Sequence, residues 1–512
     1  MTVQLPFELW WKILNYLPSD KNIIQLGSVN RVFLEIARQL RYRALEINKV
    51  DNVTNKHQLQ IIRSFSLGHH VRYLSIRPWS LSILLLGGSR HGPIKKLLSA
   101  VNIARPIFGY FERRKQTRKM KNVDKQVDLI VSTMRTLEYV REFELLFGYK
   151  EFHVEALTAI LYTLAICPFN RTLTKLSLWV PVNRLDCLTP VILPALESLD
   201  VKLYHVHTSK VDNTEGYLGH LAVYISGLSQ TLRTLSISST ILILSLDFSR
   251  FFYRLCEADF PLLHTFHFRI AGHGSVELSG FMLKTGHNLR DLELCHLFSS
   301  SHDPPSWITN ILTTRGLINT FSSLNSLYLG CEFLPGKLTL LLALISSVAS
   351  QLESFSFEYT LLTLEEVEMV IRALSCSSPS PLRHLVIESQ FLSPSIFGLL
   401  ASEFPQLETL KINYETLSST LALAEEDALL TILNLPPVKT LFYRELVIFS
   451  EAGVYAEWRL SRLRLCCVLR RHVLYIVDTT ITSALDPNAF RTCFPSLVDC
   501  ACSTAVPTFL IS

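Results

Sequence analysis

Several short stretches of this chain carry residue types that bind phosphates or act as nucleophiles, at spacings close to those that such chemistry needs. The glycines of Gly87–Gly92 have the spacing of a phosphate-binding loop, but Pro93 stands where that loop needs a lysine. The segment Gly227–Thr231 places a serine near a glycine, as a nucleophile elbow does, but it lacks the second glycine of that turn. We therefore predict no catalytic residue and no enzymatic activity.

Histidine and cysteine residues, the usual ligands of zinc, are scattered along the chain. His205 and His207 stand close together, and Cys295 precedes His296, but neither pair has further ligands at metal spacing. The eleven cysteines, an odd number, form no Cys-x-x-Cys pair and are typical of reduced, buried thiols in an intracellular protein. We therefore predict no metal site and no cofactor.

Composition favours a large folded core without a membrane segment. Of the 512 residues, 48% are hydrophobic, yet no run reaches the 18 or so uninterrupted apolar residues of a membrane-spanning helix. The longest candidate, Leu338–Ala349, is too short and contains threonine and serine. The N-terminus lacks a basic and then apolar signal. We expect a soluble protein of the cytoplasm, the nucleus or both, with no membrane partner.

One six-residue pattern organises most of the chain: Leu-x-x-Leu-x-Leu, with Phe, Val or Ile as substitutes. Clear copies begin at Leu173, Leu196, Leu232, Leu263, Leu289, Leu324, Leu352, Leu382 and Leu407, and weaker ones begin at Val71, Val140 and Val438. Leu45 and Ile47 fit a first strand. The spacing from Leu173 to Val438 averages about 29 residues, which is a repeat period.

Helix signals alternate with these copies. Thr363–Glu366 reads as a capping box, and Asp303–Pro305 and Ser393–Pro394 mark two more helix starts. Strand, turn and helix in regular alternation predict an α/β fold, with a parallel sheet on a concave side and helices on a convex side.

The chain from 44 to 512 thus resembles the leucine-rich-repeat superfamily. Its repeats lack the Asn or Cys that the family carries three residues after the last Leu of the pattern. The resemblance therefore implies an irregular solenoid.

A basic insert at about 87–125 interrupts the early repeats. It holds eleven Lys or Arg against Glu112 and Asp124, a net charge of +9, which leaves −4 on the rest of a chain whose total is +5. It could be a nuclear-localisation signal or a nucleic-acid patch, but we favour a solvated loop between the first and second repeats.

The first forty residues predict a partner instead of a reaction. Leu9, Ile13 and Leu17 recur every four residues on one helix face, while Trp10 and Leu14 form a second apolar stripe. A third short helix carries Phe33, Leu34, Ala37 and Leu40. Helices this short bury one stripe among themselves, so another molecule is expected to cover the other.

This N-terminal pattern, over residues 1–43, resembles the F-box, and an F-box before degenerate repeats is similar to fungal F-box families. The resemblance implies binding to the Skp-type adaptor of a cullin–RING ubiquitin ligase. The implied adaptor-binding residues are Leu5, Pro6, Leu9, Ile13, Leu17 and Pro18. The chain would then be the substrate-recognition subunit of that ligase. The alternative is a leucine-rich-repeat scaffold outside any ligase, whose N-terminal helices only cap the solenoid.

Strand side chains alternate, so the positions between the leucines face solvent on the concave side. The candidates for binding a target protein, whose identity the sequence does not reveal, are Trp179, Arg269, Asp291, Glu293, Tyr328, Glu388, Lys411 and Arg444. Both charge signs and several aromatics favour a protein partner over a nucleic acid, which would need a surface dominated by Lys and Arg.

Overall fold

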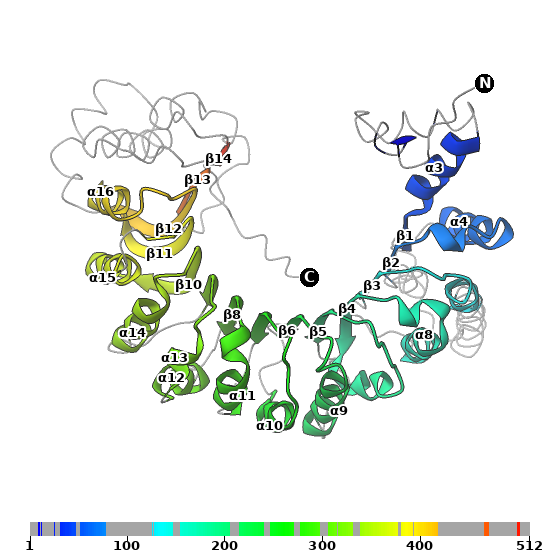
Figure 1. Ribbon diagram of the computed structural model, residues 1–512, viewed down its shortest axis with the longest axis horizontal. Coiled ribbons are helices and arrows are strands. Elements are labelled where there is room, and N and C mark those ends of the chain that lie inside the picture. The colour runs from blue at the N-terminus through cyan, green and yellow to red at the C-terminus, as the bar shows by residue number, and fades with distance from the viewer. Residues whose placement is uncertain are drawn as a thin grey trace, which may run out of the picture. The chain divides into compact units, whose positions relative to one another are not determined.

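The computed structural model describes residues 9–10, 12, 25, 31–47, 52–77, 125, 127–146, 154–204, 214–239, 246–270, 277–296, 306–314, 316–330, 338–376, 380–392, 394–417, 465–470 and 499–501. They fall into two compact units, Met1–Leu262 and Leu263–Ser512. Each unit repeats one motif, a strand followed by a helix or a 3-10 turn (Figure 1).

The first unit begins with a helix and continues as a parallel sheet whose strands follow chain order. Its elements are α3 (Arg31–Tyr42), β1 (Ala44–Ile47), α4 (Asn52–Ser64), η1 (Leu67–His70), β2 (Tyr73–Ile76), β3 (Glu142–Leu146), α8 (Val154–Ile166), η2 (Pro168–Arg171), β4 (Lys175–Pro181), η3 (Val182–Leu188), β5 (Ser198–Tyr204), α9 (Thr214–Gly227), β6 (Thr234–Ser239) and α10 (Ser249–Glu257).

The second unit is built in the same way, again with parallel neighbours in chain order. Its elements are β7 (Thr265–Ile270), α11 (Glu277–Thr285), η4 (Gly286–Asn288), β8 (Asp291–His296), α12 (Ser306–Thr313), α13 (Leu317–Thr320), β9 (Ser326–Gly330), α14 (Leu338–Val348), β10 (Ser354–Leu362), α15 (Leu364–Leu374), β11 (His384–Leu392), α16 (Pro394–Glu403), β12 (Thr409–Leu417), β13 (Leu465–Arg470) and β14 (Asp499–Ala501).

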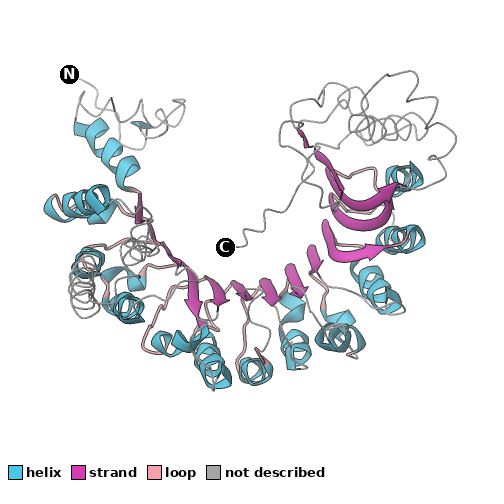
Figure 2. Cartoon of the chain, turned by 180° about the vertical axis from the view of Figure 1, so that it is seen from behind, coloured by secondary structure: helices cyan, strands magenta, loops and turns pink. Residues whose placement is uncertain are grey.

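The predicted α/β repeat fold with a parallel sheet is confirmed. In both units the strands form a row and the helices lie along one side of it (Figure 2). In every clear copy the last two apolar positions of the pattern lie on a strand, from β4 to β12, and those of the copies at Val71 and Val140 lie on β2 and β3. The copy at Val438 and most of the 87–125 insert lie outside the described residues.

Burial alternates along each strand as the pattern requires. In β5, Leu199, Val201 and Leu203 are buried, while Asp200 is half-buried and Lys202 is exposed. Burying one such side chain contributes about 1.5–3 kcal/mol, so the leucine positions decide which face of each strand turns to the helices.

One backbone hydrogen-bond pattern joins successive repeats. The carbonyl of the residue directly before a strand accepts bonds from two consecutive amides of the next repeat, as Arg141 does from Thr174 and Lys175 at 2.9 Å each. The same bond pair is made by the carbonyls of Arg43, Arg72, Thr174, Glu197, His264, Arg290, Asn325, Glu353 and Arg383, at 2.7–3.1 Å. These bonds depend only on the backbone, so the repeats align without the Asn or Cys side chains that the sequence lacks.

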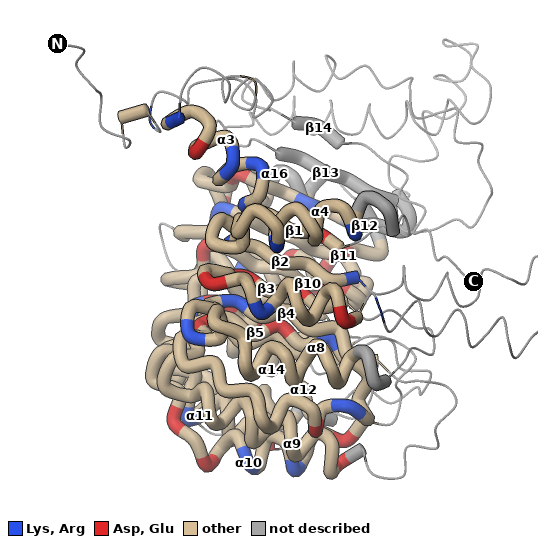
Figure 3. The backbone as a smooth tube through the Cα atoms, turned by 90° about the vertical axis from the view of Figure 1, so that its right-hand side faces the viewer, with Lys and Arg blue, Asp and Glu red and all other residues tan. Residues whose placement is uncertain are grey.

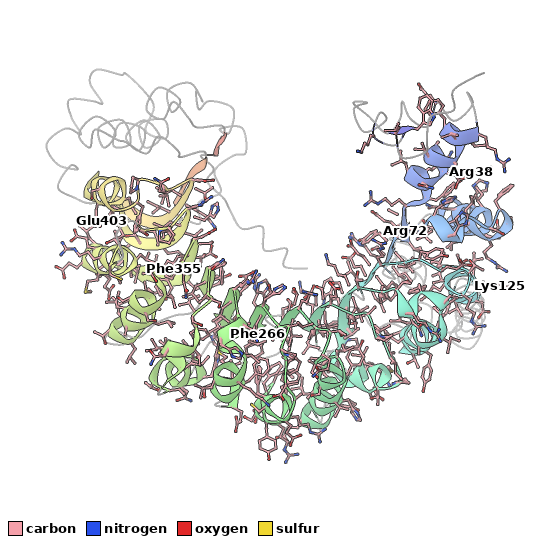
Figure 4. The ribbon with its side chains drawn as sticks, viewed as in Figure 1. Arg38, Arg72, Lys125, Phe266, Phe355 and Glu403 are labelled. Atoms are coloured by element: carbon pink, nitrogen blue, oxygen red, sulfur yellow. The ribbon has the colours of Figure 1, made fainter. Side chains whose placement is uncertain are left out.

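Aromatic side chains tie the helices of the second unit to its sheet. Phe266 on β7 meets Phe281 on α11 edge to face, with ring centroids 5.3 Å apart. Phe268, two residues after Phe266 (labelled in Figure 4), meets the buried Trp307 on α12 in the same way at 5.7 Å. Such pairs add about 0.5–1.5 kcal/mol to the burial of the rings.

The helices between the strands are short. The longest of those described is α9, with 14 residues, and no described helix combines the length and the apolar character needed to cross a bilayer.

The predicted capping box at the start of α15 is confirmed. The Thr363 hydroxyl accepts the Glu366 amide at 3.3 Å, and the Glu366 carboxylate accepts the Thr363 amide at 2.8 Å. These bonds satisfy two helix-start amides that otherwise lack partners.

A Thr363→Ala substitution should therefore lower the free energy of unfolding by about 1 kcal/mol, because it removes the hydroxyl acceptor. Urea titration followed by circular dichroism measures this change. Ser402→Ala is the control, because the exposed Ser402 hydroxyl only bonds back to the Leu399 carbonyl of its own helix and should change stability by less than about 0.5 kcal/mol. Equal effects of the two substitutions would contradict the capping role.

Candidate functional site

The second unit carries a continuous polar band on the solvent side of its sheet, which we call the polar face. It consists of His267 and Arg269 on β7, Asp291 and Glu293 on β8, Tyr328 on β9, Glu358 on β10 and Lys411 on β12. His267, Arg269, Glu293, Tyr328 and Lys411 each lie between two buried strand residues, and Asp291 and Glu358 each have one buried neighbour, Leu292 and Phe357.

His267 sits between two carboxylates of the neighbouring strand. Its Nε2 lies 3.1 Å from Asp291 Oδ2 and its Nδ1 lies 3.8 Å from Glu293 Oε2. Burial lowers the pKa of His267, but the hydrogen bond and charge of Asp291 and the charge of Glu293 outweigh burial and Arg269, so its pKa lies above its ordinary value. Burial also raises the pKa of Asp291, and His267 more than offsets this and holds it below its ordinary value.

Arg269 continues the band. Its guanidinium forms an ion pair with Glu293, its Nε donates to Glu293 Oε1 at 2.6 Å, and its central carbon lies 5.7 Å from the ring centroid of Tyr328. Such a cation over an aromatic ring is attracted to the ring face. Arg269 is thus held by two successive strands.

Tyr328 and Lys411 both contact Glu358. The Tyr328 hydroxyl donates to Glu358 Oε2 at 2.9 Å, and Lys411 Nζ lies 3.3 Å from Glu358 Oε1. Burial, together with the charge of Glu358, raises the pKa of Tyr328. The hydroxyl therefore stays protonated and can donate.

Glu388, a predicted target-binding residue, was expected to face solvent, and the structure corrects this expectation. The residue is only 5% exposed, and its carboxylate accepts the backbone N–H of Tyr359 at 3.0 Å. Tyr359 has a φ of +67°, at an irregularity where the pairing of β10 with β11 shifts register. Glu388 therefore stabilises a strained backbone segment and does not face solvent as the strand pattern suggested.

Gly330 has no side chain, and the Tyr328 and Tyr359 rings fill the space where one would stand. A Cβ atom at this position would lie 2.9 Å from Cys295 Sγ, 3.0 Å from the Tyr328 ring and 3.0 Å from the Tyr359 ring. Glycine is thus required where these side chains meet under the polar face.

Trp179 belongs to a separate cluster in the first unit. Lys202 Nζ lies 4.7 Å from the centroid of the Trp179 ring system, and the Tyr204 ring meets Trp179 edge to face at 6.2 Å. Trp179 is half-buried. Arg444 lies outside the described residues.

Glu144 on β3 gathers a second polar network in the first unit. The hydroxyls of Tyr73 and Ser75 on β2 donate to Glu144 Oε2 at 2.7 Å each, and Arg77 lies 3.6 Å away. Burial raises the pKa of Glu144, but the hydrogen bonds from Tyr73 and Ser75 and the charge of Arg77 outweigh burial. The pKa of Glu144 therefore lies below its ordinary value. Sequence analysis did not single out this carboxylate.

At the N-terminus, the structure places Leu9 and Trp10, one residue from each of the two predicted apolar stripes, in different surroundings. The Trp10 ring meets Phe33 of α3 edge to face at 5.0 Å and packs on the cluster that Phe33 and Ile36 form. Leu9, next to Trp10, is 43% exposed. Leu34, one of the apolar residues predicted on the third helix, is 39% exposed, because it lies about 100° around the helix from Phe33.

The other predicted adaptor-binding residues, Leu5, Pro6, Ile13, Leu17 and Pro18, lie outside the described residues. The structure thus tests the predicted stripes only at Leu9 and Trp10.

The polar face brings together five of the eight predicted target-binding residues: Arg269, Asp291, Glu293, Tyr328 and Lys411. His267 and Glu358 also belong to it, and strand alternation alone could have identified them. Cys295, Gly330 and Tyr359 were missed, because their roles depend on the irregular segment of β10.

Comparison with known proteins gives little. No protein-family model matches the chain, and no curated protein matches it. Among solved structures, a chain in the crystal structure of the Rad7 and Elc1 complex in yeast is similar, with 14% sequence identity and a TM-score of 0.30. That match covers 61% of this chain and 93% of the other.

We expect Gly330→Ala to lower the free energy of unfolding by about 1–3 kcal/mol, because the added methyl group overpacks the site between Cys295 and the two tyrosines. Urea titration followed by tyrosine and tryptophan fluorescence measures this. Gly227→Ala is the control, because nothing lies within 4 Å of a Cβ atom there. A loss at Gly227 as large as that at Gly330 would show that the packing argument fails.

His267 should make stability depend on pH. Its folded-state pKa is raised, so its stabilising contribution is complete below the unfolded pKa of about 6.5 and disappears as the pH rises through the folded pKa. The stability lost in His267→Gln should therefore be larger at about pH 5.5 than at about pH 8.5. An NMR titration of Asp291→Asn should show a lowered His267 pKa, and an unchanged pKa would count against the pair.

Proposed function

We propose that this chain is a non-catalytic substrate receptor of a Skp–cullin–F-box ubiquitin ligase. In this proposal the N-terminal helices bind the Skp-type adaptor and the sheet holds a target protein. The observation that carries the proposal is the contrast between two adjacent apolar residues, since Trp10 packs on Phe33 and Leu9 is left exposed.

The packing of Trp10 explains why Leu9 is available to a partner. Trp10 packs on Phe33 and Ile36 of α3, and neighbouring residues on a helix point about 100° apart. Leu9 therefore cannot share that contact. An apolar stripe through Leu9 would gain about 25 cal/mol per Å² if an adaptor covered it.

The polar face supports a protein target. Arg269, Lys411 and, when it is protonated, His267 stand beside Asp291, Glu293 and Glu358, each within 4 Å of a carboxylate oxygen. Mixed charges of this kind give no net field to attract a nucleic-acid backbone. Lysines and arginines also stand among acidic residues along the described chain (Figure 3). Arg and Tyr, both present here, are enriched in protein interfaces.

The mechanism we propose is proximity. A receptor that holds its target near a ubiquitin-conjugating enzyme raises the effective concentration of the target lysine. The hydrogen bonds between repeats keep the polar face in register, so the chain contributes geometry and no reacting group. Such a receptor would act in the cytoplasm, the nucleus or both.

A scaffold outside any ligase remains the rival, with the same fold and no adaptor binding. We expect the full chain to capture a purified Skp-type adaptor, and Leu9→Asp to weaken that binding by about thirtyfold. A buried apolar anchor contributes about 2 kcal/mol at an interface, which is about thirtyfold in Kd. Biolayer interferometry measures the change.

Leu262→Asp is the matched control, because Leu262 is 40% exposed and Leu9 is 43% exposed. This control should bind the adaptor like the parent. No adaptor binding by the parent, or an equal loss in both variants, would reject the ligase proposal in favour of the scaffold.

A further inference from the structure

Three metal-ligating side chains converge where α3 meets the first repeat. Glu35 lies on α3, and His69 and His70 lie on η1. One ligand atom from each side chain lies within 4.8 Å of those of the other two. Sequence analysis named none of the three, since more than thirty residues separate Glu35 from the histidines.

His69 presents a nitrogen lone pair. Its Nδ1 lies 2.8 Å from the backbone carbonyl oxygen of Ser66. A carbonyl can only accept, so Nδ1 must carry the proton and Nε2 must be unprotonated in the neutral ring. Metal-binding histidines are commonly oriented by such a bond from the other ring nitrogen to a carbonyl or carboxylate.

His70 and Glu35 are spaced to hold an ion between them. His70 is 4% exposed, and its Nε2 lies 3.6 Å from Glu35 Oε1, which is too long for a hydrogen bond. Two ligand atoms at about 2.0–2.1 Å from a tetrahedral zinc ion lie roughly 3.3 Å apart. A small adjustment of the half-exposed Glu35 side chain therefore brings both atoms into bonding distance.

The cationic side chain that follows the two histidines, Arg72 (labelled in Figure 4), is held by other partners. Its Nη1 donates to the His69 backbone carbonyl at 2.6 Å, and its guanidinium carbon lies 5.2 Å from the centroid of the Tyr139 ring.

The turn that carries both histidines is held tightly. Ser66, directly before η1, has a left-handed conformation with φ +50°. Gly68 packs so closely that a Cβ atom would lie 2.3 Å from the Thr136 carbonyl oxygen. A turn fixed in this way presents its side chains with little freedom to lose on binding.

We propose that Glu35, His69 and His70 bind one divalent transition-metal ion, with zinc as the best match, and that the ion ties α3 to the first repeat. Two imidazoles and one carboxylate are a ligand set that zinc accepts, with water in the fourth position. The site does not depend on the proposed function, since it uses no adaptor-binding or target-binding residue.

The test uses the full chain, freed of metal with a chelator and titrated with Zn²⁺ against a chromogenic competitor. We expect one zinc per chain, confirmed by elemental analysis. His69→Gln and Glu35→Gln should each weaken binding by tenfold or more, because each removes one of three ligands. Both side chains are at least partly exposed, so the variants should fold, and circular dichroism checks this.

His220→Gln is the matched control, because His220 is an exposed histidine on α9, and its zinc affinity should equal that of the parent. Hydrogen exchange should show slower exchange in α3 when zinc is present, in the parent and in this control only. The proposal would be overturned if the parent bound no stoichiometric zinc, if all variants had equal zinc affinity, or if hydrogen exchange in α3 did not change when zinc was added.

Discussion

The pair of hydrogen bonds that one backbone carbonyl accepts at the start of ten described strands, β1–β5 and β7–β11, is the constraint on which the rest of this structure depends. The acceptor is always the residue directly before the strand, and the donors are two consecutive amides of the next repeat. Because only backbone atoms take part, the bonds tolerate Arg, Thr, Glu, His or Asn at the acceptor position. They set the register from repeat to repeat where the usual side-chain ladder is missing, and this allows loops of very different lengths between strands.

The polar face follows from that register. Once Phe266, Leu292 and Leu327 lie opposite one another, the residues one position away must do the same on the solvent side. His267 therefore meets Glu293, and Glu293 meets Tyr328. The charged groups satisfy each other across strands, so the face is held rigid before any partner arrives. Rigid polar groups lose little conformational entropy on binding, which favours specific recognition of a protein surface.

The repeat is irregular at two places, β10 and η1, and at each a left-handed residue stands close to an unusual arrangement of polar side chains. In β10 the pairing shifts, Tyr359 adopts a left-handed conformation, and the buried Glu388 carboxylate holds its amide. At η1 the left-handed Ser66 and the tightly packed Gly68 turn His69 and His70 towards Glu35. In β10 the hydrogen bond from the Tyr359 amide to Glu388 offsets the cost of the left-handed residue, and at η1 the close packing of Gly68 follows the left-handed Ser66.

The sequence by itself determined the repeat, the strands, the parallel α/β fold, the Thr363 cap and most of the polar face, since each depends on residues within a few positions of one another. Periodic leucines decide which way a strand faces, and alternation then decides what faces solvent. Only the tertiary structure decided that Glu388 is buried, that Leu34 is exposed, that Gly330 must be small, and that Glu35 meets His69 and His70. These features depend on contacts between residues far apart in the chain, and local patterns carry no information about such distances.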